Sequence, residues 1–340
     1  MILPHDMTYI DISTSGGPEV LVPQRTTLPE VGAEAVLIRI AAAGVNGPDL
    51  AQRRGQYAPP PGASPIPGLE VAGDVVASGA AVKGWSIGDR VMALTNGGGY
   101  AEYVAVPQGQ VLPVPAGWRY AEAAALPETW FTVTQTLVMR AGVAPGMFVL
   151  VHGGAGGIGG AAIQIVTLLG AKAIAVVSDS AKFDYCLGLG AIAVIDRTAD
   201  DIVERVKAIT GGHGADRIVD IVGGDMAAVN VAAAARGGHI VQISTLEGGA
   251  ANVPLRQMMA KDLTLSGSTL RPQSAAVKAA IATRLASDLL PRLGSGAGVR
   301  PAVTTFPLEA ASEAHWVMEG RGHRGKLVLL TAFGMTENAI

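Results

Sequence analysis

The 340-residue sequence has little of what several classes of protein require. It contains a single cysteine, Cys186, which excludes an internal disulfide framework and any zinc site built from several cysteines. Aromatic residues make up only 4% of the chain and charged residues 16%, and the net charge is −3. Nothing in this balance indicates nucleic acid or an anionic lipid surface as the main partner.

Long hydrophobic runs are also missing. No segment reaches about 18 uninterrupted apolar residues, so we expect no membrane-spanning helix. The first ten residues, MILPHDMTYI, lack the basic region and the apolar stretch of a secretory signal, so we expect a cytoplasmic protein. The chain is nevertheless 49% apolar and is long enough for two domains with a large core.

The first 128 residues have the pattern of short strands separated by proline and glycine turns. Apolar or alternating runs predict strands over Ala35–Ala42 and Val71–Val76, and Trp85–Leu94 resembles a turn that leads into a strand. The segment Tyr57–Gly68, YAPPPGASPIPG, must be a loop, and its prolines would keep that loop stiff.

From about Thr129 the pattern changes to alternating strands and helices, which is typical of an α/β fold with a doubly wound parallel sheet. We therefore expect a dinucleotide-binding domain over residues 129–271 and a second, β-rich domain made from residues 1–128 and 272–340. The last ten residues are expected to be frayed. The predicted strands of the parallel sheet are Phe148–Val151, Lys172–Val177, Ile192–Ile195, Arg217–Ile221, His239–Ile243 and Leu263–Gly267.

The most informative segment runs from Phe148 to Gly170. Four apolar residues are followed by glycines at 153, 154, 156, 157, 159 and 160, and then by apolar residues at helical spacing from Ile158 to Leu169. A strand, a glycine turn and a helix in this order form a dinucleotide-binding unit, in which the helix N-terminus faces the pyrophosphate. A flexible glycine linker is disfavoured, because linkers are not flanked by such apolar periodicity.

The end of the next predicted strand indicates which dinucleotide is bound. An acidic residue at this strand end would hold the ribose hydroxyls of NAD, but the strand ends Val177-Ser178 and a lysine, Lys182, follows. Hydroxyl and cationic donors suit the 2′-phosphate of NADPH, and Arg197 could add a second cation. Asp179 would oppose the phosphate if it turned inward, and Lys182 could instead be a solvated lysine on a first helical turn.

The order of a β-rich domain, a domain with GGAGGIG at 153–159, and a return to the first domain resembles the medium-chain dehydrogenase/reductase superfamily over nearly the whole chain. Four segments resemble its zinc-free quinone oxidoreductase branch, in particular the inducible, apoptosis-linked NADPH quinone oxidoreductases and their bacterial counterparts. They are GVNGPDLAQRRGQYAPPPGASPIPG at 44–68, ALPETWFTVT at 125–134, Gly88-Asp89-Arg90 and Gly325-Lys326. The resemblance implies a GroES-like catalytic domain, a Rossmann domain and a homodimer joined through the edge strand near Leu263–Gly267.

The zinc-dependent members of that superfamily have a cysteine at the position of Asn46 and a Gly-His-Glu sequence where this chain has Gly68-Leu69-Glu70. Their four-cysteine lobe is replaced by the short loop Thr95–Tyr100. Neither Asn46 nor Leu69 is a plausible zinc ligand, so we expect no metal. Without a Lewis acid, reduction of a quinone or an unsaturated carbonyl is easier than alcohol oxidation.

The leading hypothesis is therefore an NADPH-dependent quinone reductase that positions the nicotinamide against its acceptor. Two alternatives stay open. One is an enoyl or 2-alkenal reductase, for which Arg53, Arg54 and Arg271 leave a basic entrance for a phosphorylated carrier possible. The other is an NADPH-binding redox sensor with little turnover.

The resemblance also implies candidate site residues. Tyr57 is the preferred residue for contact with the acceptor, although it could be only an anchor for its loop. Asn46 would contact the nicotinamide ribose or be a turn residue. Asp49 would hold Arg53 or the loop, or cap a helix. Thr132 would meet the carboxamide, Arg271 could reach the cleft, and Lys326 the phosphates. The remaining cofactor contacts are expected at Gly153, Gly154, Ala155, Gly156, Gly157, Ile158, Ser178, Lys182, Arg197, Ile243, Ser244 and Leu270. His152, Trp130 and Cys186 are expected to be structural.

Overall fold

The computed structural model describes residues 3–320 and 322–337, and it divides into two compact units. Unit 1 comprises Met1–Phe131, Arg271–Leu290 and Arg300–Ile340, and unit 2 comprises Thr132–Leu270 and Pro291–Val299. The expected domain boundaries after residues 128 and 271 lie next to these junctions. The segment Pro291–Val299 groups with unit 2, whereas the sequence pattern assigned it to the catalytic domain.

Unit 2 is built on a six-stranded parallel sheet with the strand order β10-β9-β8-β11-β12-β13. In chain order this is 3-2-1-4-5-6, the order of a doubly wound dinucleotide-binding sheet, so the predicted fold class is confirmed. The topological switch lies between β8 and β11, beside the glycine loop. The strands are β8 (Phe148–His152), β9 (Lys172–Val177), β10 (Ala193–Asp196), β11 (Ala215–Asp220), β12 (Ala234–Gln242) and β13 (Thr264–Gly267).

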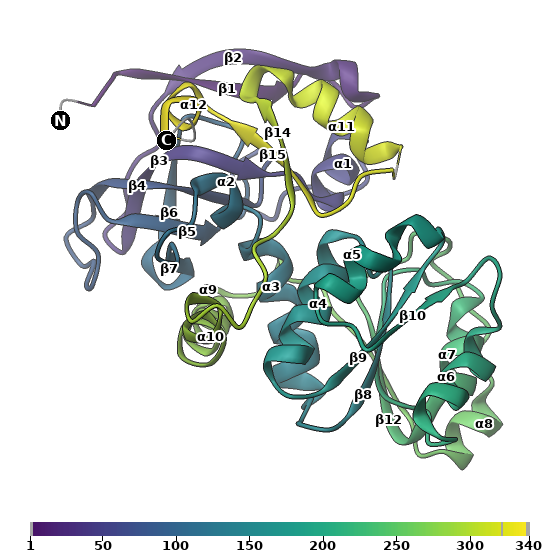
Figure 1. Ribbon diagram of the computed structural model, residues 1–340. Coiled ribbons are helices and arrows are strands. Elements are labelled where there is room, and N and C mark those ends of the chain that lie inside the picture. The colour runs from purple at the N-terminus through teal and green to yellow at the C-terminus, as the bar shows by residue number, and fades with distance from the viewer. Residues whose placement is uncertain (1–2, 321, 338–340) are drawn as a thin grey trace. The chain divides into compact units, whose positions relative to one another are not determined.

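Helices cover both faces of this sheet, as Figure 1 shows, with α4 and α5 on one side and α6, α7 and α8 on the other. The central strands β8 and β9 are nearly continuous runs of Val, Ile, Leu and Ala because both of their faces are buried. The helix bounds are α4 (Gly157–Leu168), α5 (Phe183–Gly188), α6 (Ile202–Thr210), α7 (Met226–Ala233) and α8 (Leu255–Ala260).

Unit 1 contains a mainly antiparallel seven-stranded sheet with the order β14-β15-β3-β4-β5-β7, and β6 also pairs with β3. The long strand β3 holds this sheet together, because it pairs with β4, β6 and the C-terminal β15. The strands are β3 (Ala35–Gly44), β4 (Glu70–Ser78), β5 (Arg90–Leu94), β6 (Tyr103–Pro107), β7 (Val111–Pro113), β14 (Val303–Pro307) and β15 (Lys326–Leu330), with β1 (Asp6–Ile12) and β2 (Leu21–Thr27) forming a separate hairpin.

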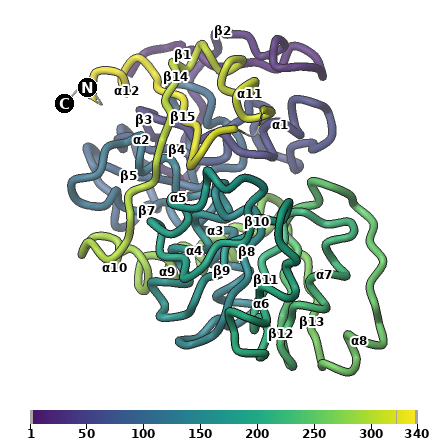
Figure 2. Tube along the Cα trace, turned by 45° about the vertical axis from the view of Figure 1, so that its right-hand side comes forward, coloured from purple at the N-terminus to yellow at the C-terminus, as the bar shows by residue number. Residues whose placement is uncertain are grey.

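The return of the chain to its first domain is visible in Figure 2, where the yellow C-terminal strand β15 lies next to β3. The remaining helices are α1 (Gly47–Arg53), α2 (Tyr120–Ala123), α3 (Pro127–Val133), α9 (Ala275–Arg284), α10 (Leu290–Gly294), α11 (Ala311–Glu319) and α12 (Ala332–Glu337). The expectation of a frayed tail is wrong for residues 332–337, which form α12. Gly334 packs so closely on β3 that a Cβ there would lie 1.8 Å from Ala41 O, while residues 338–340 lie outside the described part.

Candidate active site

The glycine loop between β8 and α4 packs more tightly than any residue with a Cβ allows. Gly153 has a φ of +65°, and a Cβ there would lie 2.5 Å from Ile221 Cδ1. A Cβ on Gly159 would lie 2.1 Å from Gly153 O, so the first turn of α4 rests directly on the loop. Glycine is therefore required at both ends of the turn, for conformation at the first position and for close approach at the second.

The start of α4 offers backbone donors and no capping side chain. Its N-cap is Gly156. The loop uses the Gly154 N–H for Val176 O at 3.0 Å and the Gly156 N–H for Gly153 O at 2.9 Å. The next N–H groups, at the predicted residues Gly157 and Ile158, belong to the first turn, whose donors have no partner inside a helix and lie at its positive end. These residues fit the pyrophosphate of a dinucleotide.

The predicted phosphate-binding residues lie at the carboxyl ends of β9 and β10. Ser178 is exposed after β9, and the Arg197 N–H donates to Val177 O at 2.9 Å, so both positions belong to one sheet edge. Asp179 does not turn inward unpaired, because its carboxylate accepts the Ala181 N–H at 2.9 Å and caps the short turn that contains Lys182. The Arg197 guanidinium, however, already forms an ion pair of 2.7 Å with Glu247.

A buried polar chain supports the loop from below. His152 Nε2 and Asn230 Oδ1 lie 2.7 Å apart, and Asn230 Nδ2 donates to Asp220 Oδ2 at 2.8 Å. All three side chains are buried, and burial lowers the pKa of His152, so the imidazole is neutral at physiological pH. The structural role expected for His152 fits these contacts. Cys186 and Trp130 are likewise buried, as predicted.

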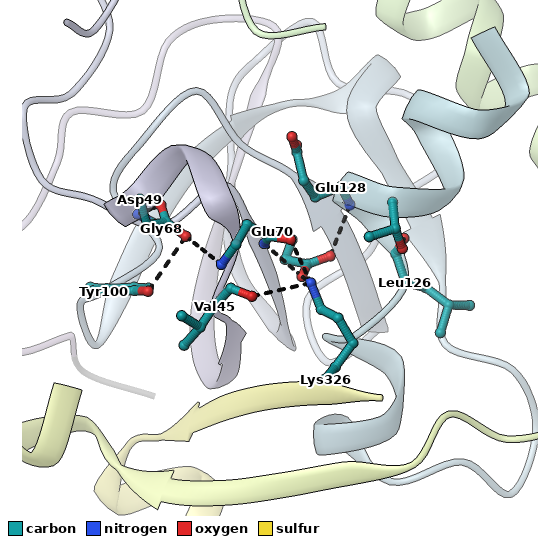
Figure 3. Close-up of polar contacts among 10 residues, drawn as sticks. Val45, Asp49, Gly68, Glu70, Tyr100, Leu126, Glu128 and Lys326 are labelled. Atoms are coloured by element: carbon teal, nitrogen blue, oxygen red, sulfur yellow. Dashed lines mark hydrogen bonds and ion pairs between the residues drawn. The ribbon is translucent and has the colours of Figure 1, made fainter. Parts of the chain in front are cut away.

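In unit 1, Asn46 belongs to a buried network with Glu70 and Lys326. Figure 3 shows the Lys326 ammonium beside the Glu70 carboxyl group. Asn46 Nδ2 donates to Glu70 Oε1 at 2.9 Å, and its Oδ1 accepts from Lys326 Nζ. The same ammonium lies 2.6 Å from Glu70 Oε1 and donates to Val45 O at 3.3 Å. Both ends of the Asn46 amide are therefore engaged inside unit 1, and so is the Lys326 ammonium that the resemblance directed to the cofactor phosphates.

Asp49 stabilises the start of α1 and the end of the proline-rich loop. Its Oδ2 accepts the Asn46 N–H at 2.9 Å, which makes it the third residue of a capping box, and its Oδ1 accepts the Gly68 N–H at 3.0 Å. Tyr100 donates to the same carboxylate at 3.4 Å. Burial raises the pKa of Asp49 to about 6 against the lowering effect of the backbone donors. The capping role is thus present, with Asn46 as the N-cap itself.

Arg53 is not held by Asp49. Its buried guanidinium donates to Gly16 O at 3.0 Å, approaches His315 Nδ1 at 3.4 Å and pairs with Glu319. Arg54 pairs with the same Glu319 carboxylate at 2.6 Å. His315 Nε2 also lies 3.0 Å from the Tyr100 hydroxyl. Neither arginine is therefore an uncommitted cation.

Tyr57 is partly exposed and lies over Arg271, with the guanidinium carbon 5.5 Å from the ring centroid. Within residues 3–320 and 322–337 its hydroxyl has no hydrogen-bond partner. Burial, and then the charge of Glu128, raise the pKa of Tyr57, so the hydroxyl stays protonated and can donate to a carbonyl oxygen. This arrangement fits the role of an acceptor-binding residue.

Arg271 packs against Tyr57 and supports the loop that carries it. The guanidinium is 5% exposed and donates to Asn96 O at 2.9 Å and to Gln52 Oε1 at 2.8 Å. Gln52 in turn donates to Pro65 O of the proline-rich loop at 2.7 Å. Lys278 donates to Arg271 O at 2.7 Å, and burial lowers the pKa of this lysine to about 8. Arg271 therefore has extensive structural contacts, and a contact with the cofactor stays a prediction.

The remaining predicted cofactor residues lie in unit 2. Thr132 in α3 is 7% exposed, Leu270 is 6% exposed, and the Ile243 N–H donates to Asp220 O at 2.8 Å. The Ser244 carbonyl accepts from Gln242 Nε2 at 2.6 Å. Sequence reasoning did not identify the polar contacts that Glu70, Glu128 and Lys278 make in unit 1. Glu70 was considered only as part of the zinc-binding sequence of related enzymes. The sequence Pro127-Glu128-Thr129 has the pattern of an ordinary helix start, so it did not single out Glu128.

The residues around Glu70 do not fit a catalytic zinc ion. Leu69 has no donor atom, and the Glu70 carboxylate is engaged by the Lys326 ammonium and the Asn46 amide. In the part of the chain that the structure describes, no group of three or more His, Cys, Asp or Glu side chains is arranged to hold a metal. A catalytic zinc requires three protein ligands and an open position.

Comparison with known proteins identifies the family. One family model, described as an alcohol dehydrogenase GroES-like domain, matches residues 32–116, and another, described as a zinc-binding dehydrogenase, matches residues 157–285. The quinone oxidoreductase of Sus scrofa is 30% identical over 329 residues, which cover 95% of this chain and 98% of the relative. The chain belongs to the quinone oxidoreductase family of the medium-chain dehydrogenase/reductase superfamily.

Solved structures agree with this assignment. The Escherichia coli quinone oxidoreductase complexed with NADPH has a TM-score of 0.82 at 29% identity, and the match covers 95% of this chain and 99% of that one. The CurK enoyl reductase has a TM-score of 0.84 at 24% identity, over 96% of this chain and 100% of that one, a likeness in fold alone. The predicted family, the GroES-like and Rossmann architecture and the oxidoreductase class are confirmed. The finer resemblance to the inducible subgroup stays a prediction.

Proposed function

We propose that this member of the quinone oxidoreductase family reduces a quinone, or a similar electron-poor carbonyl compound, with NADPH and without a metal ion. The observation that supports it most directly is the Asn46–Glu70–Lys326 network. The Lys326 ammonium lies among the polar residues that would have to bind a metal, and it is ion-paired with the Glu70 carboxylate at 2.6 Å. A delocalised acceptor such as a quinone does not require a Lewis acid, because its developing oxyanion is spread over the ring.

The cofactor proposal rests on unit 2. The turn at Gly153–Ile158 and the uncapped start of α4 would hold the pyrophosphate, and Ser178 with Lys182 would receive the 2′-phosphate. Arg197 would also bind the 2′-phosphate once its ion pair with Glu247 rearranges. When bound, NADPH supplies the hydride. An NADPH complex of a related protein at 29% identity supports the choice of this dinucleotide.

The acceptor proposal rests on unit 1. The Tyr57 ring offers a flat apolar surface, and its protonated hydroxyl, which has no partner in the described residues, donates to the acceptor oxygen. Arg271 and the Gln52–Pro65 contact hold the loop that carries Tyr57. Asn46 and Asp49 act as positioning residues, because they fix α1 and Gly68 through buried hydrogen bonds.

A quinone is preferred over an enoyl thioester on a phosphorylated carrier. The three arginines that could have formed a basic entrance are committed to other groups: Arg53 and Arg54 to Glu319, and Arg271 to Asn96 and Gln52. A small flat acceptor needs no such entrance. Enoyl or 2-alkenal reduction, and a binding protein with little turnover, are the outcomes that the assay below separates.

The assay is NADPH oxidation by EDTA-treated protein with benzoquinone, phenanthrenequinone and crotonyl-CoA in parallel, and with NADH as the control donor. Turnover with the quinones and preference for NADPH are expected. Turnover with crotonyl-CoA alone would move the proposal to enoyl reduction, and no turnover with any acceptor would favour the binding protein. Loss of activity on EDTA treatment that zinc restores would contradict the metal-free proposal.

We also propose a homodimer formed through β13. This strand is at the edge of the unit 2 sheet, pairs only with β12 among the described strands, and exposes Leu265 by 40%. Nearby, Leu255 and Met259 of α8 are 65% and 76% exposed. Edge strands with apolar side chains are usually covered, and pairing with a second copy would cover both edges. No described helix is long and apolar enough to cross a membrane, and a cytoplasmic location stays a proposal from the sequence.

A further inference from the structure

Three carboxyl groups of unit 1, those of Glu70, Asp49 and Glu128, interact electrostatically, and one of them differs from the other two. Glu70 is fully buried and accepts from Lys326, Asn46 and the Glu128 N–H. Asp49 is 1% exposed and accepts two backbone N–H groups. Both are fixed as acceptors by donors on two or more sides. Glu128, at the start of α3, is partly exposed.

The backbone of Glu128 is anchored while its side chain is not. Its N–H donates to Glu70 Oε2 at 2.8 Å, which fixes the start of α3 to β4. Figure 3 shows the Glu128 side chain extending away from Glu70, with no contact drawn to its carboxyl group. Within residues 3–320 and 322–337 that carboxyl group has neither a hydrogen bond nor an ion pair. Its position is therefore defined, yet its oxygens are available to a ligand.

The charges around Glu128 favour the neutral acid. Partial burial, and then the negative charges of Glu70 and Asp49, raise the pKa of Glu128 to about 8, although Lys326 and Lys278 oppose the shift. The same carboxyl group acts electrostatically on Tyr57 and on Arg271, whose guanidinium carbon lies 5.5 Å from the Tyr57 ring centroid. Tyr57 is a hydrogen-bond donor with a raised pKa and is a poor source of a proton.

We propose that Glu128 is the catalytic acid of the reaction, and that its carboxylic proton is transferred to the acceptor oxygen as the acceptor is reduced. This proposal rests on the function proposed above. Hydride from NADPH delivers two electrons and one proton to a quinone, which gives the hydroquinone monoanion. The Glu128 O–H bond breaks and a hydroquinone O–H bond forms, which leaves the neutral hydroquinone and a Glu128 carboxylate. Water then reprotonates the carboxylate.

The decisive variant is Glu128→Gln, which keeps the shape of the side chain and removes its acidic proton. We expect kcat with quinones to fall about 100-fold, since a positioned general acid contributes on the order of 100-fold or more. The matched control is Glu122→Gln. Glu122 is a 5%-exposed carboxylate of unit 1 that pairs with Arg119 and Arg300. The control should keep wild-type kcat, and thermal unfolding of both variants checks that they fold.

The pH profile distinguishes an acid from a structural residue. The active form is the protonated one, so kcat/KM of the wild type should fall as pH rises through about 8, the pKa of Glu128. In E128Q this fall should be absent. An active wild type combined with an E128Q variant that has the same kcat and the same pH profile would overturn the role of Glu128 and leave the proposed function intact.

An infrared measurement tests the protonation state without any turnover. In the cofactor-free protein at neutral pH, a protonated-carboxyl band should be present in the wild type and in E122Q and should be missing in E128Q. If no such band disappears in E128Q, Glu128 is ionised and the proposal is overturned. If the wild type reduces none of the acceptors, the proposed function fails, and the role of Glu128 as its acid fails with it.

Discussion

Replacing Lys326 with methionine tests the energetic role of the ammonium in the buried cluster. The Lys326–Glu70 pair is nearly inaccessible, with 6% and 0% of the two side chains exposed, so the substitution strands a carboxylate away from water. Breaking a buried pair by removing one partner costs about 3–5 kcal/mol. With a urea m-value of about 2 kcal/mol/M, the unfolding midpoint of unit 1 should fall by roughly 2 M.

The chain offers a convenient probe for this measurement. Its four tryptophans, Trp85, Trp118, Trp130 and Trp316, all belong to unit 1, so intrinsic fluorescence follows the unfolding of that unit. The exposed Lys83 gives a matched control, and K83M should stay within about 0.5 kcal/mol of the wild type.

A double variant completes the test. Adding Glu70→Gln to K326M removes the stranded charge, so most of the lost stability should return. A K326M midpoint within experimental error of the wild type at neutral pH would refute the reasoning, because it would mean that the ammonium does not compensate the Glu70 carboxylate. A double variant as unstable as K326M alone would show that packing, rather than charge, dominates.

Four further outcomes are expected. Tyr57→Phe should lower kcat with quinones about tenfold and leave KM for NADPH unchanged in steady-state assays, because only the acceptor loses a donor; an unchanged kcat would contradict this. Glu247→Gln should lower Kd for NADPH about threefold by fluorescence titration, since it frees Arg197 from an exposed pair, and Kd for NADH should not move. The stability of unit 1 should decrease as pH falls from about 6.5 towards 3. Burial lowers the pKa of folded His315 to about 3, so in this range the unfolded state binds a proton that the folded state does not. His315→Gln should flatten this slope in acid denaturation. Leu265→Lys should give a monomer by light scattering, and a wild type that is already monomeric would contradict the dimer.

The fold of unit 2 was predictable in detail because its signals are local. Strands β8 and β9 are short apolar runs in an alternation of strands and helices, and β9 and β13 were expected almost residue for residue. The frayed tail was the clear failure. Its residues 332–337 have weak helical periodicity, and α12 forms because Gly334 packs against Ala41 of a strand almost 300 residues away.

The candidate site was predictable only where one residue type implies one role. The tight packing of the loop glycines followed from their spacing, and the position of Ser178 and Arg197 at one sheet edge followed from the predicted strands. The partners of charged residues did not follow: sequence reasoning left Arg53 with Asp49 or in a basic entrance, and it directed Lys326 to the cofactor. In the structure Arg53 pairs with Glu319, and Lys326 pairs with Glu70.

The sequence by itself determined the GroES-like and Rossmann architectures, the family and the dinucleotide-binding turn, because backbone conformation and apolar periodicity depend on residues that are neighbours in the chain. Only the tertiary structure decided which charges face each other. Lys326 reaches Glu70 because β15 returns to pair with β3, which pairs with β4 on its other side. Complete burial of Asp49 and partial burial of Glu128 then raise the pKa values of these two groups, and burial is a property of the folded chain as a whole.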